Sequence, residues 1–281
     1  MASPSCISKT TNGPGFTLVE LSIVLVIIGL IIGGVLVGRD LITAATVRAQ
    51  IAQIEKYQTA VNTFRGKYGY LPGDIPDPAV TQFGLAARAG SVGSGDGNGL
   101  IEAGAAGGNQ EAGENRLFWN DLSTTQLING QFVGQDCVQE VGTCVAESTP
   151  TGISSIIPAA TIGRGNYITI VPEANGNGYA IMGGVTGLGI YGDIDAASGN
   201  YLGITPQEAY SMDAKIDDGN PTTGRVLSIY APWPVTGPPP AGLAGTASLG
   251  ECGDTDTAPT SYNRGSLYAN LIVCMISIRF Q

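Results

Sequence analysis

One long apolar run dominates the first part of the chain. It covers residues 16–38 and contains a single ionisable side chain, that of Glu20. A helix of about 20 apolar residues crosses the hydrocarbon core of a bilayer, so this run is long enough to span one. The apolar part of a cleaved secretory signal is shorter, about 7–15 residues, and a small-residue cleavage site follows it. Neither feature is present here, and the run therefore predicts a transmembrane helix over residues 16–38.

A second apolar pattern follows without interruption. Beyond Arg39, apolar residues recur at steps of three and four, which is the period of one helix face. They are Ile51, Ile54, Tyr57, Val61, Phe64 and Tyr68. The pattern covers too few heptads to require a soluble coiled coil, which is the alternative. We therefore expect residues 39–66 to continue the first helix as an amphipathic helix, giving one helix of about 50 residues.

Residues 67–281 are expected to form a loop-rich globular domain, since 42 residues of the chain are glycine and only 13% are charged. A helix is predicted over residues 114–128. Another helix is expected after Thr205, because Pro206 suits a first helical position and Glu208 completes a capping box. Short apolar runs between Gly and Asn turns predict strands. They cover residues 167–171, 179–182, 226–230 and 270–279.

These elements predict an α+β fold. The long N-terminal helix would be half transmembrane and half amphipathic. Its amphipathic half would pack on an antiparallel sheet in a loop-rich, disulfide-bonded domain.

The junction in front of the apolar run carries a specific motif. Residues 15–20 read Gly-Phe-Thr-Leu-Val-Glu. This junction resembles the class III leader junction of type IV pilins and type II secretion pseudopilins. In that family a membrane-bound prepilin peptidase cuts after the glycine and methylates the new N-terminal residue. The resemblance implies a leader peptide of residues 1–15, cleavage between Gly15 and Phe16, and N-methylation of Phe16.

Glu20 has two interpretations. A carboxylate inside a membrane span costs a few kcal/mol, so such acids are candidates for function. The simpler interpretation is that Glu20, near the start of the span, reaches the lipid head groups or is protonated. The resemblance implies instead that Glu20 pairs with the amine of Phe16 on a neighbouring subunit. That amine exists only after cleavage, so the pair would link processing to assembly.

The resemblance also implies a function and a location. The chain would be a structural subunit of a pilus-like filament, made of copies of itself or of related pilins. Prepilin peptidase, an inner-membrane assembly platform and membrane lipid before assembly would be its other partners. Its N-terminus would be cytoplasmic and its head, residues 67–281, periplasmic before it reaches the cell surface.

A DNA-uptake pilin remains open, although the acidic composition disfavours it, and so do two other functions. The first is a pseudopilin of a type II secretion system, which would form a short periplasmic filament. The second, from a different class, is a single-pass membrane anchor that carries a periplasmic binding domain. The second alternative leaves the motif at residues 15–20 as a coincidence.

The amino-acid composition excludes several kinds of catalytic and binding site. The chain of 281 residues has no histidine, which excludes Ser-His-Asp and Cys-His catalysis and the commonest zinc ligands. We therefore expect no enzymatic activity. The net charge of −10 disfavours nucleic acid as a partner, since phosphate contacts rely on Lys and Arg.

Four of the five cysteines lie outside the expected leader. Four cysteines allow three connectivities. We favour Cys137–Cys144, which closes a short loop, and Cys252–Cys274, which ties a loop to the last strand. Such pairing needs an oxidising compartment, in agreement with a periplasmic or extracellular domain.

Two groups of polar residues are weak candidates for a cation site. Residues 94–101 place Ser94, Asp96 and Asn98 like the first ligands of a calcium loop, but Ala105 stands where the loop needs a glutamate. We favour a flexible polar turn there. Asp217 and Asp218, with Asp213, end the second predicted helix. Solvation of a helix end is the favoured interpretation over binding of a hard cation, so no cofactor is expected, with calcium as the alternative.

Overall fold

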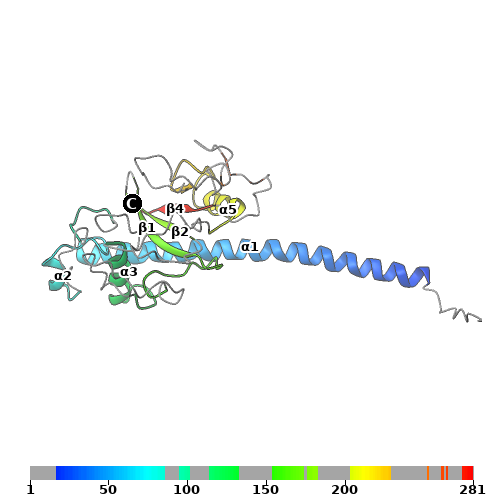
Figure 1. Cartoon of the computed structure of the whole chain (residues 1–281), viewed down its shortest axis with the longest axis horizontal. Coiled ribbons are helices and arrows are strands. Elements are labelled where there is room, and N and C mark those ends of the chain that lie inside the picture. Colours follow the sequence, from blue (N-terminus) through cyan, green and yellow to red (C-terminus); the bar gives the residue numbers. More distant parts are fainter. Residues whose placement is uncertain are drawn as a thin grey trace, which may run out of the picture. The chain divides into compact units, whose positions relative to one another are not determined.

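The computed structural model describes residues 17–85, 95–101, 114–132, 154–173, 176–182, 203–228, 252, 261–262, 264 and 274–280. The chain forms two compact units, Met1–Ala45 and Thr46–Gln281. We call the second unit the head unit. Figure 1 labels the helices and strands.

Helix α1 (Leu18–Tyr68) is continuous over 51 residues, which confirms the predicted single helix. Gly69 ends it in a left-handed conformation, with φ +78°, and its N–H donates to the Arg65 carbonyl over 2.8 Å. Burial on α1 begins only in the head unit. The buried residues are Val47, Gln50, Ile54, Tyr57, Ala60, Val61 and Phe64.

In the first unit, the part of α1 that precedes Thr46 is apolar and exposed. Its large aliphatic side chains are 45–86% exposed. The most apolar window of α1, with a mean hydropathy of 2.9, is long and apolar enough to cross a membrane, and none of it is buried.

The head unit contains a small antiparallel sheet. Its strands are β1 (Tyr167–Glu173), β2 (Gly176–Met182), β3 (Val226–Ser228) and β4 (Ile276–Arg279). Their spatial order is β1-β2-β4-β3, so the last strand of the chain lies between β2 and β3. Each of the four predicted strands is present, although residues 229–230 and 270–273 of the predictions lie outside the described part.

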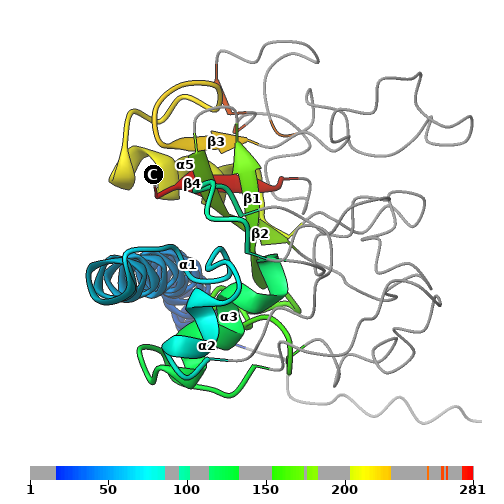
Figure 2. The ribbon, with the colours of Figure 1, turned by 90° about the vertical axis from the view of Figure 1, so that its left-hand side faces the viewer.

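Within the described residues of the head unit lie three further helices: α2 (Ala79–Gln82), α3 (Glu114–Thr124) and α5 (Pro206–Ile216). Helix α3 lies beside β1 and α5 beside β3, as Figure 2 shows. Helix α5 has the predicted capping box between Thr205 and Glu208. The fold class is α+β, as predicted.

Helix α3 is shorter than the predicted helix over residues 114–128. Gln126 takes a positive φ of 59°, and the Leu127 N–H donates to the Leu122 carbonyl over 3.0 Å. This bond spans five residues, as in a Schellman ending, so the helix stops after Thr124 and the chain turns away.

Aromatic side chains connect these elements in one core. Tyr57 of α1 contacts Trp119 of α3 edge-on, with ring centroids 5.0 Å apart. The ring centroid of Tyr179 in β2 lies 4.5 Å from that of Phe280, which follows β4. The amphipathic part of α1 therefore shares its buried face with α3 and with the sheet.

Candidate functional site

The first candidate site is the N-terminal end of α1. The backbone N–H and the hydroxyl of Thr17 donate to Oε2 of Glu20 over 2.8 and 2.7 Å. The N–H of Glu20 donates in turn to the Thr17 hydroxyl over 3.2 Å. This is a reciprocal capping box, and it satisfies N–H groups that the first helical turn cannot pair internally.

The capping box fixes where the Glu20 carboxylate lies in the single chain. It holds the acid at the start of the helix, where the helix dipole also favours a negative charge. Gly15 and Phe16, the predicted cleavage and methylation residues, lie outside the described part of the chain, as does the whole predicted leader.

The surface that follows Glu20 is apolar on every side. After Glu20, Arg39 and Asp40 are the only other ionisable residues in residues 17–45. Four glycines interrupt the aliphatic side chains. At Gly29, Gly33, Gly34 and Gly38 an added Cβ would meet nothing within 4 Å. A partner helix could therefore approach the backbone closely along this stretch.

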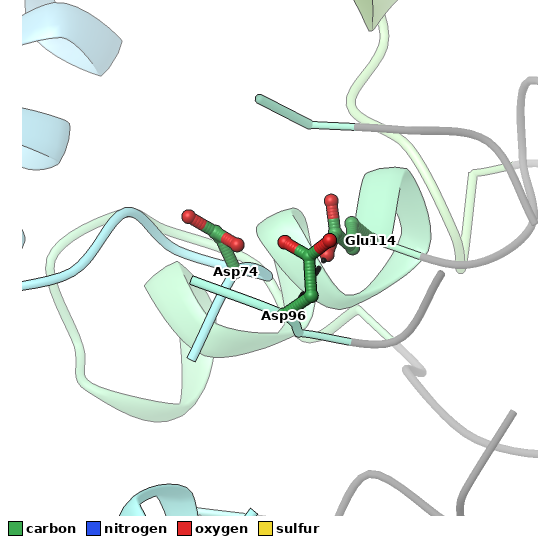
Figure 3. A group of neighbouring side chains, drawn as sticks. All are labelled: Asp74, Asp96 and Glu114. Atoms are coloured by element: carbon green, nitrogen blue, oxygen red, sulfur yellow. Dashed lines mark hydrogen bonds between the residues drawn. The ribbon is translucent and has the colours of Figure 1, made fainter. Parts of the chain in front are cut away.

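The second candidate site is a group of three acids in the head unit (Figure 3). Asp74, Asp96 and Glu114 each place one carboxylate oxygen within 4.8 Å of the others. Asp74 and Glu114 are buried and Asp96 is exposed. Carboxylate oxygens at this spacing are ligands of the kind that calcium prefers.

The hydrogen bonds of this group show what it does in the chain itself. Asp74 accepts from the N–H groups of Gly97 and Gly99 over 2.7 and 2.8 Å. Glu114 accepts from the N–H groups of Gly95 and Asp96 over 2.9 and 3.3 Å. Two buried carboxylates therefore hold the backbone of the loop at residues 95–101. Burial raises the pKa of Asp74, while the two glycine N–H groups act to lower it.

Two of the side chains that suggested a calcium loop, Asp96 and Asn98, form hydrogen bonds within their own loop. Asp96 accepts from the backbone N–H of Asn98 and from its amide group, both over 2.9 Å. Asn98 accepts from the Leu100 N–H over 2.6 Å. Both side chains thus form short turns within their own loop. Ser94 lies outside the described residues.

The sequence analysis did not predict Asp74 and Glu114 as residues of this site. A signal was present, because a glycine-rich loop has many N–H groups and few side chains to compete for them. Buried acceptors had to lie nearby, and an acid at the start of a predicted helix, such as Glu114, was one candidate.

The third group of acids lies at the end of α5, where carboxylate oxygens of Asp213, Asp217 and Asp218 lie within 4.8 Å of one another. Asp217 and Asp218 are exposed, as expected for a helix end. The solvated interpretation is wrong for Asp213, which is fully buried and accepts from the Tyr262 hydroxyl over 2.9 Å. Burial raises the pKa of Asp213 to about 6.

The head unit contains a disulfide between Cys252 and Cys274, 22 residues apart in the sequence. It is one of the two pairs favoured from the sequence. Cys137 and Cys144, the other pair, lie outside the described residues.

Comparisons with known protein families, with curated proteins and with solved structures found no match.

Proposed function

We propose that the chain is a structural subunit of a type IV pilus-like filament, cleaved between Gly15 and Phe16, N-methylated at Phe16 and assembled through the first part of α1. One observation carries the proposal: this part of α1 is apolar around its whole circumference and is exposed in the single chain.

An exposed helix that is apolar on all sides is not stable in water. Such a helix is stable in a lipid bilayer or among other apolar helices. A filament subunit needs both environments in turn, lipid before assembly and neighbouring subunits afterwards. The four glycines with open space around them support close packing in the second environment.

The position of Glu20 supports the same proposal. It is the only ionisable residue of the apolar run, and in the single chain it interacts with Thr17 of its own helix. In a filament, the Phe16 amine of a neighbour replaces these neutral partners with a charged one. An ion pair in a low-dielectric environment is strongly attractive, although desolvation offsets part of the gain.

The head unit gives the subunit its soluble surface. In this proposal the chain first spans the inner membrane once, with its N-terminus in the cytoplasm and the head in the periplasm. Subunits then add head to tail through heterologous contacts, which do not close and therefore form a helical filament.

The experiment is intact-mass and N-terminal analysis of the chain from its host membrane and from a sheared surface fraction. The expected result is a chain that begins with N-methylated Phe16, is present in the sheared fraction, and is absent from it when Gly15 is replaced by leucine. A chain that keeps residues 1–15 in its host would contradict the proposal and favour the anchored binding domain. A cleaved chain that stays in the membrane fraction would favour the secretion pseudopilin.

A further inference from the structure

Two neighbouring charged residues follow the C-terminal end of the apolar run of residues 16–38, which we call the apolar stretch. Arg39 and Asp40 are both exposed on α1 in the first unit. Among the described residues, neither side chain makes a hydrogen bond or an ion pair. Residues i and i+1 project about 100° apart on a helix and do not face each other. One helix therefore presents a cation in one direction and an anion in another.

Such a pair of charges is complementary to a second copy of the same chain. One copy can offer its arginine to the aspartate of the next copy, and so on along a series. This is a heterologous contact, which is the kind that extends a filament. The question is whether one axial shift between copies satisfies both this contact and the contact at Glu20.

The contact at Glu20 fixes the shift, and this step rests on the proposed function. For the Phe16 amine of a neighbour to lie level with Glu20, the neighbour must be displaced by four residues, about 6 Å at 1.5 Å per residue. With that displacement, Arg39 of the neighbour lies level with residue 43 of the first copy. It is then about 4.5 Å along the axis from Asp40 of the first copy.

The direction of the side chains closes this gap. Side chains on a helix lean toward its N-terminus, and the long Arg39 side chain of the neighbour reaches further in that direction, from the level of residue 43 toward Asp40, than the short Asp40 side chain leans away. The opposite pairing, from Arg39 of the first copy to Asp40 of the neighbour, spans about 7.5 Å and requires the arginine to lean the wrong way. Only one of the two pairings therefore fits.

We propose that Arg39 of each subunit pairs with Asp40 of the adjacent subunit, so that ion pairs at both ends of the apolar stretch fix a single register. In both pairs the same neighbour supplies the cation, first the Phe16 amine and then Arg39. The two acids, Glu20 and Asp40, belong to the other copy. The apolar residues between the pairs pack in whatever alignment these pairs set.

The alternative is that Arg39 and Asp40 only mark the edge of the membrane, where charged side chains extend to the lipid head groups. In that case the two residues act independently of each other. Their effects on the free energy of assembly then add, so the losses in filament yield multiply. A pair shows the opposite behaviour, because removal of one partner already removes the interaction.

The first experiment measures the amount of chain in sheared filaments for R39Q, D40N and the double variant R39Q/D40N. Intact mass verifies in each case that the chain is made and that Phe16 is methylated. We expect each single variant to lose about tenfold in filament yield, since it leaves the other charge unpaired. The double variant should be no worse than either single variant. R39K and D40E, which keep the charges, should retain most of the yield.

Arg48 provides a matched control, since it is also an exposed arginine on α1 but lies beyond the apolar stretch. R48Q should leave the yield unchanged. Equal losses for R48Q and R39Q would overturn the inference. So would a double variant whose loss is the product of the two single losses.

The second experiment tests whether the pair lies between copies. In R39K filaments, a carbodiimide activates the Asp40 carboxyl, the amine of the introduced lysine displaces the activated group, and an amide forms while the carbodiimide leaves as a urea. We expect a ladder of covalent multimers on a denaturing gel, above the level in unsubstituted filaments. R39K/D40N should give no ladder above the level in unsubstituted filaments. A ladder above that level in R39K/D40N, or no increase above it in R39K, would overturn the inference.

The two proposals fail in different ways. If the unsubstituted chain is not cleaved and forms no filament, the proposed function itself is wrong. If its filaments form and depend on Glu20, but R39Q has no effect, only the pairing of Arg39 with Asp40 is wrong.

Discussion

The Tyr262 hydroxyl donates a hydrogen bond of 2.9 Å to the Asp213 carboxylate inside the head unit. The other oxygen of Asp213 accepts from the Gly219 N–H over 3.1 Å. Asp213 is 0% exposed and Tyr262 3% exposed. A buried acid therefore connects α5 to the turn that follows it and to a segment near the end of the chain.

This acid should make the head unit less stable as the pH rises. Burial raises the pKa of Asp213 from 3.8 to about 6, and the charges of Asp218 and Asp217 act in the same direction. Between these two values the folded chain holds a proton that the unfolded chain has lost. The free energy of unfolding contributed by this group therefore falls from about pH 4 to pH 6 and is flat above that range.

The variant D213N isolates the effect, since an amide keeps the shape and does not titrate. Its carbonyl can accept from Gly219 and its NH2 group can donate to the Tyr262 oxygen. We expect D213N to be at least as stable as the unsubstituted chain at pH 8 and to lack the decrease between pH 4 and pH 6. Urea unfolding of the detergent-solubilised chain, followed by tryptophan fluorescence, measures this. If the free energy of unfolding of D213N fell between pH 4 and pH 6 as steeply as that of the unsubstituted chain, the prediction would be contradicted.

A second acid should have the opposite pH dependence. Glu208 is buried, which acts to raise its pKa, but the guanidinium of Arg164 and the N-cap Thr205 outweigh burial and lower the pKa. Arg164 Nη2 lies 2.7 Å from Glu208 Oε2. A lowered pKa stabilises the folded state above the unfolded pKa of about 4.5, and this stabilisation is lost as the pH falls below it.

We therefore expect R164Q to lower the free energy of unfolding by about 2 kcal/mol at pH 7, because it leaves a buried carboxylate without its charged partner. The difference from the unsubstituted chain should shrink below pH 4, where Glu208 takes up a proton. Unfolding at both pH values measures it, with R48Q as the control on an exposed arginine. A loss of the same size at both pH values would show that the ion pair is not its cause.

The sequence was sufficient wherever the determinant is local. The apolar period of α1 predicted one helix of about 50 residues, and the structure has 51. Thr205 and Glu208, three residues apart, predicted the capping box of α5 because both partners lie in one helical turn.

The sequence was insufficient where the partner is distant. Asp213 follows the pattern of a solvated helix end, and its burial depends on Tyr262, which is 49 residues away. Asp74 accepts hydrogen bonds from a loop 23 and 25 residues later in the chain. A single sequence gives no measure of which acid lies against which loop. For the same reason, the acids that hold the loop at residues 95–101 were not predicted, whereas the turn itself was.

Gly73 and Gly69 allow a comparison of steric space at similar backbone conformations, with φ values of +86° and +78°. A Cβ on Gly73 would collide with the Glu114 carbonyl oxygen at the start of α3, whereas a Cβ on Gly69 would meet nothing within 4 Å. We expect G69A to cost about 1 kcal/mol, for the left-handed conformation alone. G73A should cost about 3 kcal/mol or more, since α3 must also move.

Urea unfolding of both variants measures the difference. G73A should also perturb the hydrogen bond of 2.7 Å from the Gly73 N–H to Asp121, which joins the same two segments. Equal costs for G69A and G73A would mean that the two segments do not pack as closely as the structure shows.

The disulfide between Cys252 and Cys274 should stabilise the head unit mainly through the unfolded state. It closes a loop with a sequence separation of 22 residues. The loss of chain entropy on closing a loop of that size corresponds to about 3 kcal/mol. Because Cys274, two residues before β4, also pairs with Ile204 through an isolated bridge, the disulfide keeps this part of the chain in place beside the residues that lead into α5.

The double variant C252S/C274S is therefore expected to unfold about 3 kcal/mol more easily than the oxidised chain, at equal pH and without reductant. A reductant should destabilise the unsubstituted chain by a similar amount. The same reductant should change the free energy of unfolding of C252S/C274S much less. Any remaining effect then reports on other cysteines. If oxidation state does not alter the unfolding of the unsubstituted chain, the bond between Cys252 and Cys274 does not contribute to the stability of the head unit.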